Sequence, residues 1–302
     1  MSLRPLLVVT DLSDAGDSAV RVALALARPG HGRLVVAHVL PQGVPMQANV
    51  LFPHLPVGQP GSPLALTEAA EAAVQARVSP LIGEHVEWGV RVLDGAMPDA
   101  ILALAGELDA AVIVVAPGTL AAEIARARLA PVVVARPSPA NGPVIGATDF
   151  SDAAMPALRA AAQVARESGA RLVAAHCIEL QPMAALGGGG VAVTGVTAMP
   201  DLMLDELAND ARHRLAAALA EAGAEGTASV TLAPPGPGLV ELAGSEEAAL
   251  VVVGTHGRTG LSRLLMGSVA TYVADHASCS VMIVPLGEPA EDDRAGAQVA
   301  GS

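Results

Sequence analysis

The chain has 302 residues, 52% of them hydrophobic, so it is long enough for two domains with separate cores. Aromatic residues make up only 1%. The cores must therefore consist of Val, Leu, Ile and Ala, and few rings remain for stacking on bases. The formal charge of −13 argues against nucleic acid and against an anionic membrane as partners.

All 17 basic residues are arginine. A phosphate loop of the G-x-x-x-x-G-K-[ST] type and Schiff-base chemistry both need lysine, so both are excluded. The two cysteines, Cys177 and Cys279, are too few for a disulfide framework and are expected to be small buried thiols. No apolar run approaches the ~18 residues of a membrane span, and Asp11 comes too early for a signal peptide. We expect a soluble cytoplasmic protein.

The first residues predict a strand, a turn, a helix and a second strand. Residues 6–9 and 34–38 are apolar runs typical of buried parallel strands. Between them, Ala19, Val22, Ala23 and Leu26 form one apolar face of a helix, and Ser13 or Asp14 is placed to cap its start.

This pattern returns 138 residues later, at 143–177, with 16 identities in 35 aligned positions. Two copies of one domain explain the repeat. The shared polar residues follow the first strand and end the second: Thr10 and Thr148, Asp11 and Asp149, Ser13 and Ser151, His38 and His176.

Both copies continue with the same predicted elements: a helix, a strand, a short helix opened by proline, and a strand. In the first copy these are residues 66–82, 86–93, a helix from Pro98, and 111–116. In the second they are residues 202–222, 228–233, a helix from Pro237, and 250–254. Final strands follow at 132–135 and 281–284. The Pro-rich residues 41–63 and the Gly-rich residues 186–195 predict loops, and residues 287–302 a disordered tail.

A glycine-rich segment follows the strand at 250–254. Gly254 ends the strand, Gly257 lies in the loop, and a helical pattern opens at Gly267 and Ser268. Such a loop lets backbone N–H groups approach an anion, and the helix start adds free donors. This predicts a phosphate site. The first copy offers only Gly118 in a shorter segment, so it has lost the loop.

These residues resemble a tandem universal stress protein, with two UspA-type domains in one chain. The resemblance covers residues 4–286. Its sharpest part is Gly254-x2-Gly257-x9-Gly267-Ser268 followed by Val269, the pattern of the ATP-binding branch of that family. The run 148–152 and His176 support it.

The resemblance implies an α/β fold of two doubly wound domains, residues 1–137 and 143–286 with a linker at 138–142. Each would hold a five-stranded parallel sheet in the order 3-2-1-4-5 with helices on both faces. Strands 1 and 4 would then open a crevice that brings Asp149 and Gly254 together. The resemblance also implies that the domains pair through their last strands, and it leaves a further homodimer open.

For the site, the resemblance implies ATP. Gly254, Gly257 and Gly267 would wrap the phosphates, and Ser268 would donate its hydroxyl or cap the helix. We expect Gly257→Ala and Gly267→Ala each to abolish binding, because a Cβ would meet the phosphates or strain a positive φ.

Other site residues keep two interpretations. Asp149 would accept ribose hydroxyls or hold a phosphate-bound Mg²⁺, or only cap a helix. His256 would touch phosphate or fill a turn; Arg258 and Arg263 would neutralise phosphate or lie in solvent. By resemblance, Thr148 and Cys177 would lend backbone groups to the base. His38 and His176 would be structural or line the base pocket.

The function predicted is an ATP-binding regulatory or stress-response module with one site, in the second domain, and at most slow hydrolysis, since no residue is evidently a catalytic base. The first domain would be a built-in partner. Two alternatives stay open: an ATP-using enzyme of the related α/β superfold, slowly hydrolysing or adenylating, and a nucleotide-free dimerisation scaffold.

Overall fold

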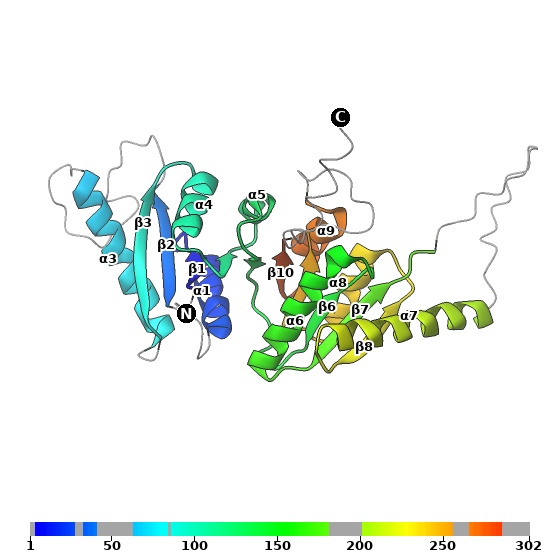
Figure 1. Ribbon diagram of the computed structural model, residues 1–302. Helices are drawn as coiled ribbons and strands as arrows, with labels where there is room; N and C mark the ends of the chain where they lie inside the picture. Colours follow the sequence, from blue (N-terminus) through cyan, green and yellow to red (C-terminus); the bar gives the residue numbers. More distant parts are fainter. Residues whose placement is uncertain are drawn as a thin grey trace, which may run out of the picture.

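The computed structural model describes residues 4–27, 33–40, 63–83, 86–180, 201–255 and 266–285. The predicted tail and the predicted loop at 186–195 lie outside these residues, as do His256, Gly257, Arg258 and Arg263. The described residues form two α/β units that share one sheet (Figure 1).

The first unit alternates strands and helices along the chain. Its elements are β1 (Leu6–Val9), α1 (Asp14–Leu26), β2 (Leu34–Leu40), α3 (Pro63–Ile82), β3 (Trp88–Asp94), α4 (Met97–Glu107), β4 (Val112–Val115), α5 (Thr119–Ala127) and β5 (Val132–Val134).

The second unit repeats this order, with a 3₁₀ turn added before its first helix. Its elements are β6 (Val144–Ala147), η1 (Asp152–Ala154), α6 (Met155–Ser168), β7 (Leu172–Cys177), α7 (Asp201–Glu221), β8 (Thr227–Thr231), α8 (Pro235–Ser245), β9 (Leu250–Gly254), α9 (Ser268–His276) and β10 (Ser280–Val284).

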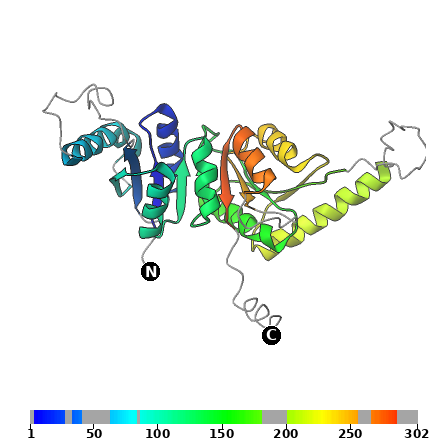
Figure 2. The ribbon, with the colours of Figure 1, turned by 90° about the horizontal axis from the view of Figure 1, so that it is seen from above.

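The strand order across the sheet is β3-β2-β1-β4-β5-β10-β9-β6-β7-β8. Each half therefore has the order 3-2-1-4-5 with parallel neighbours, which confirms the predicted fold class. At the centre β5 and β10 run antiparallel, with Val134 opposite Val281 and Val132 opposite Ile283. Figure 2 shows the two units side by side along this sheet.

Helices cover both faces of the sheet. Because side chains alternate along a strand, Leu7 and Val9 of β1 face one layer while Leu6 and Val8 face the other. The first layer holds α4, α5, α8 and α9; the second holds α1, α3, α6 and α7. Burial on both faces explains why the strands are apolar throughout rather than alternating.

Several elements differ from the sequence expectation, three of them in an informative way. The helix α8 begins at Pro235 rather than Pro237, because Pro234 is extended (φ −55°, ψ 138°) and proline is tolerated in a first helical turn. The strand β8 spans Thr227–Thr231 instead of 228–233. The helix α5 was not predicted at all; its buried residues are Ala121, Ile124 and Ala125.

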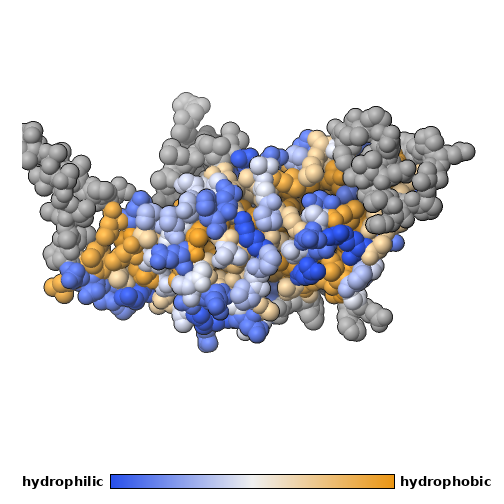
Figure 3. Space-filling view, turned by 180° about the vertical axis from the view of Figure 1, so that it is seen from behind, coloured by the Kyte–Doolittle hydropathy of each residue, from blue (hydrophilic) through white to orange (hydrophobic). Residues whose placement is uncertain are grey.

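The surface on the side opposite to Figure 1 is largely hydrophilic at its centre (Figure 3). The end of α7 that extends away from the sheet is an exception, since Leu202 and Met203 are exposed there. None of the helices in the described part of the chain is long and apolar enough to cross a membrane.

Candidate functional site

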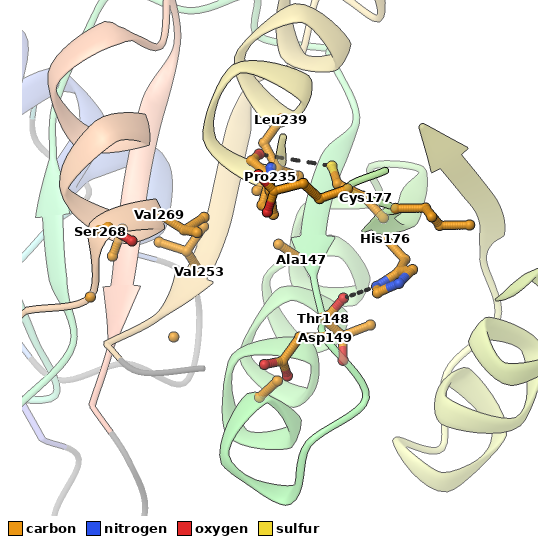
Figure 4. A pocket seen from close by; sticks show the side chains of 17 residues that line it. Ala147, Thr148, Asp149, His176, Cys177, Pro235, Leu239, Val253, Ser268 and Val269 are labelled. Atoms are coloured by element: carbon orange, nitrogen blue, oxygen red, sulfur yellow. Dashed lines mark hydrogen bonds between the residues drawn. The ribbon is translucent and has the colours of Figure 1, made fainter. Parts of the chain in front are cut away.

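A cavity of about 510 Å³ lies at the carboxyl ends of the strands of the second unit (Figure 4). It opens where β6 and β9 are neighbours, the point at which the connections of a doubly wound sheet leave in opposite directions. Seven predicted site residues line it: Thr148, Asp149, Cys177, Gly254, Gly267, Ser268 and Val269. The other three, His256, Gly257 and Arg258, are outside the described residues.

The turn after β6 fixes the orientation of Asp149. Its Oδ1 accepts hydrogen bonds from the backbone N–H of Ser151 (3.0 Å) and from the Ser151 hydroxyl. The Thr148 hydroxyl accepts one from the N–H of Phe150 (3.0 Å), whose backbone is left-handed (φ 65°). The carboxylate is thus held by the turn between β6 and η1.

The first unit has the same turn at Thr10–Ser13. Asp11 accepts from the N–H of Ser13 (3.0 Å), and Leu12 takes the left-handed conformation (φ 63°). Burial would raise the pKa of Asp11, but the hydrogen bonds from the Ser13 hydroxyl and backbone outweigh it and lower the pKa, so this carboxylate is ionised. Since both units build this turn, it does not by itself specify a ligand.

His176 lies at the edge of the cavity and is also a structural residue. Its Nδ1 lies 2.8 Å from the carbonyl oxygen of Thr148, and His38 makes the equivalent contact of 2.9 Å with Thr10. A carbonyl only accepts, so Nδ1 carries the proton. The N–H of Thr148 donates to Ala175 in the sheet (3.0 Å), so a ligand could bond the backbone of Thr148 only at the carbonyl that also accepts from His176.

The amino end of α9 faces the cavity. Gly267 precedes the helix and no side chain caps it. The first intrahelical hydrogen bond runs from the N–H of Thr271 to the carbonyl of Gly267 (3.0 Å), so the N–H groups of Ser268, Val269 and Ala270 have no acceptor in the helix. All three residues line the cavity. Ser268 is the first helical residue and not the cap.

The expected backbone strain is wrong for Gly267. This residue has φ −60° and ψ 149°, an extended conformation open to any residue. Only the steric part of the argument for a glycine remains there.

A second helix, α8, also begins at the cavity, but it offers few donors. Pro235 and Pro237 in its first turn have no N–H. Pro235 and Leu239 instead supply apolar lining beside α9, which packs against α8 (Figure 4). Neither residue is among the site residues predicted from the sequence, although the Pro-Gly-Pro-Gly run at 235–238 signals a helix start with few donors.

The first unit lacks the segment that precedes α9. Only residues 116–118 separate β4 from α5, whereas residues 255–267 separate β9 from α9. The loss of the loop in the first copy is therefore visible as a direct strand-to-helix connection.

A sequence profile of the universal stress protein family matches residues 2–119 and 140–285, which together make up most of the chain. The chain belongs to the universal stress protein family. The two matched segments correspond to two family domains in tandem.

Individual members of the family match one domain length. A universal stress protein of Methanocaldococcus jannaschii is 31% identical over 137 residues, 45% of this chain and 78% of the relative. One from Synechocystis sp. is 30% identical over 149 residues, 47% of this chain and 97% of the relative.

Solved structures of the family share the tandem fold. A crystal structure described as a putative universal stress protein from Pseudomonas aeruginosa superposes with a TM-score of 0.62 at 15% identity, covering 94% of each chain. A universal stress protein from Archaeoglobus fulgidus reaches 0.60 at 16% identity, covering 95% of this chain and 98% of that one.

The cysteines of this universal stress protein are weakly acidic thiols. Burial raises the pKa of Cys177 and of Cys279 to about 11. The Cys177 Sγ lines the cavity and lies 3.8 Å from the carbonyl oxygen of Pro235. A thiol of this acidity is neutral near pH 7 and is a poor nucleophile.

Within the described residues, no group of three or more His, Cys, Asp and Glu side chains is placed to hold a metal ion. The carboxylates in the cavity lining are Asp149 and Glu179. Any cation there would therefore need most of its ligands from water or from the phosphates of a bound nucleotide.

Proposed function

We propose that the second unit binds ATP in this cavity and that the protein acts as a nucleotide-binding regulatory module in a stress response. The observation that carries the proposal is the uncapped amino end of α9, which presents three consecutive N–H groups to a cavity at the β6/β9 crevice. Free helix N–H groups and the positive end of the helix dipole favour phosphate.

The size and lining of the cavity support a nucleotide. Its volume of about 510 Å³ lies within the range of about 300–1,000 Å³ typical of small-molecule sites. Ser268 and Val269 begin α9 and would offer N–H groups to an anion, and Pro235 and Leu239 of the neighbouring helix α8 add apolar lining (Figure 4). A nucleotide needs both kinds of lining, because it carries charged phosphates at one end and a flat base with apolar ring faces at the other.

Asp149 would act on the part of the ligand between these ends. The turn after β6 already orients its carboxylate, so it would accept ribose hydroxyls or bind a Mg²⁺ carried by the phosphates without a change of conformation. Gly254 and Gly267 flank the approach to α9, and Cys177 and Thr148 would contribute backbone carbonyls near the base.

We further propose that the first unit is a built-in partner rather than a second ATP site. It keeps the Asp11 turn and His38 but connects β4 to α5 through residues 116–118 alone. The antiparallel pairing of β5 with β10 would then replace the contact that two separate chains would make.

Calorimetric titration of the full chain with ATP, AMP and adenosine tests this function. We expect one ATP site per chain, tighter binding of ATP than of adenosine, and unchanged ATP after hours of incubation with Mg²⁺. Steady release of ADP or an adenylated product would favour the enzyme, and absence of binding by all three ligands would favour the scaffold.

A further inference from the structure

Arg136 follows β5 of the first unit, yet its side chain binds the second unit. Its Nη2 donates to the carbonyl oxygen of Ala274 (2.5 Å) and lies 3.5 Å from that of Asp275. Both carbonyls belong to the last turn of α9, where a helix has no donors of its own. A cation at this end also complements the negative end of the helix dipole. Arg136 therefore caps α9 from the other unit.

The backbone around Arg136 is tied to the second unit as well. The N–H of Arg136 donates to the hydroxyl of Ser280 (3.1 Å), which in turn donates to the carbonyl of Arg136 (3.0 Å). The N–H of Ser280 donates to the hydroxyl of Ser138 (2.9 Å). Ser280 begins β10 and is 2% exposed, so these bonds are shielded from water on the Ser280 side.

The carboxyl end of α9 differs from its counterpart in the first unit, because one of its carbonyls receives a donor from the other unit. The helix α5 ends in a left-handed residue of its own, Arg128 (φ 57°), whose N–H donates to Ala125 (3.3 Å). In α9 the residue after the helix, Ala277, is extended (φ −63°, ψ 141°), and its N–H donates to Val273 (3.0 Å). The next carbonyl, that of Ala274, receives its donor from Arg136.

We propose that Arg136 is a positioning residue for the nucleotide site. By holding the carboxyl end of α9, it sets the direction in which the amino end, Ser268–Ala270, points into the cavity. The first unit thereby contributes to phosphate binding in the second unit without touching the ligand. This inference rests on the proposed function. It gives the first unit a role in phosphate binding even though that unit lacks a glycine-rich loop of its own.

The test compares Arg136→Met with Arg4→Met in the full chain. Arg4 is a matched control because it donates to the carbonyls of Asp109 (2.9 Å) and Ala110 (3.2 Å), just beyond α4 in the first unit. Arg136→Lys is a third variant that keeps the charge but loses the planar fork, and it guards against a methionine variant that does not fold.

Two readouts are needed. Calorimetry should show ATP binding at least about fivefold weaker in Arg136→Met, with adenosine binding changed by less than about twofold, because only the phosphates meet α9. Hydrogen exchange of the ligand-free protein should show faster exchange at residues 271–276. For Arg136→Lys, the ATP affinity and the exchange rate should lie between those of wild type and Arg136→Met. For Arg4→Met, both quantities should equal those of wild type.

The outcomes separate this inference from the proposed function. If α9 exchanges at the wild-type rate in folded Arg136→Met, or in Arg136→Lys should the methionine variant not fold, the positioning role is wrong. An equal loss of ATP and adenosine affinity would also contradict it. If the wild-type protein binds neither ligand while α9 loosens as expected, the contact is real and the nucleotide function is wrong.

Discussion

The N–H of Gly267 donates a 2.7 Å hydrogen bond to the carbonyl of Thr255. Thr255 directly follows β9, and its own N–H donates to Val284 at the end of β10 (3.0 Å). The first residue before α9 is therefore fastened to the sheet at the point where β9 and β10 end. The donor groups of α9 are held in place by this link in the protein without a ligand, so binding would not have to order them.

This link predicts different results for two substitutions at Gly267. Its φ of −60° suits both alanine and proline, but only proline removes the N–H that Thr255 accepts. Gly267→Ala should leave the free energy of unfolding within about 0.5 kcal/mol of wild type, and Gly267→Pro should lower it by about 1–2 kcal/mol. Denaturant titration measures both; equal losses would show that the hydrogen bond does not anchor α9.

A core contact distinguishes the two units. A Cβ on Gly146 of β6 would lie 2.8 Å from the Cβ of Ala161 and 3.0 Å from Leu158 Cδ1. The equivalent residues in the first unit are Val8, Val20 and Ala23, all fully buried. The first unit thus pairs Val8 of the strand with Val20 of the helix, whereas the second unit pairs Gly146 with the larger Leu158.

Gly146→Val should accordingly lower the free energy of unfolding by about 1–3 kcal/mol through overpacking. Adding Leu158→Val should recover part of that loss, because it removes the 3.0 Å contact with Leu158 Cδ1 but not the 2.8 Å contact with the Ala161 Cβ. The denaturation midpoints of the single and double variants test this. A double variant less stable than Gly146→Val alone would show that the contact with Leu158 does not cause the loss of stability.

The cysteines give a pH-dependent signature. Both thiols have a pKa of about 11 in the folded protein, above the value of about 9 in an unfolded chain. A raised folded pKa stabilises the protein below the unfolded pKa. This contribution is therefore constant below about pH 9 and is lost as the pH rises from about 9 to about 11.

Alkylation at pH 8 should accordingly be slow at both cysteines. Saturating ATP should slow it further at Cys177, which lines the cavity, and leave Cys279 unchanged, because Cys279 is buried outside it. Peptide mass spectrometry with iodoacetamide follows the two sites separately. Rapid alkylation of Cys177 that is insensitive to ATP would argue against a ligand in this cavity.

Much of the fold could be predicted because its signals are local. Runs such as Leu250–Val253 indicate buried parallel strands. The pair Thr10-Asp11 occurs again at Thr148-Asp149, which indicates two equivalent units. The helix α5 escaped prediction because two of its three buried residues are alanines, which give little periodic signal in so short a segment.

Some of the residues that line the cavity could be singled out from the sequence because their signals are local as well. Asp149, Gly254 and Ser268 occur at recognisable strand ends and helix starts, and the sheet order brings them to one cavity. Two other contacts join residues that are far apart in sequence and leave no local pattern. Arg136 donates to the carbonyl of Ala274, and Arg214 lies 4.0 Å over the ring of Phe150. Nor does the identity of a glycine reveal its φ, which is why the strain expected at Gly267 was wrong.

The most direct test of the account places one negative charge at equivalent positions of the two units. Ser268 and Thr119 are the exposed first residues of α9 and α5. In both helices the preceding residue is a glycine, and no side chain caps the helix. An aspartate there favours the helix in both cases, so both variants should fold.

Calorimetric titration of Ser268→Asp and Thr119→Asp with ATP then shows whether phosphate binds at the amino end of α9. The account predicts that Ser268→Asp weakens ATP binding by at least about tenfold through repulsion of the phosphates, while Thr119→Asp binds one ATP per chain with wild-type affinity. Undiminished binding by Ser268→Asp, or an equal loss in both variants, would contradict a single phosphate site at the amino end of α9.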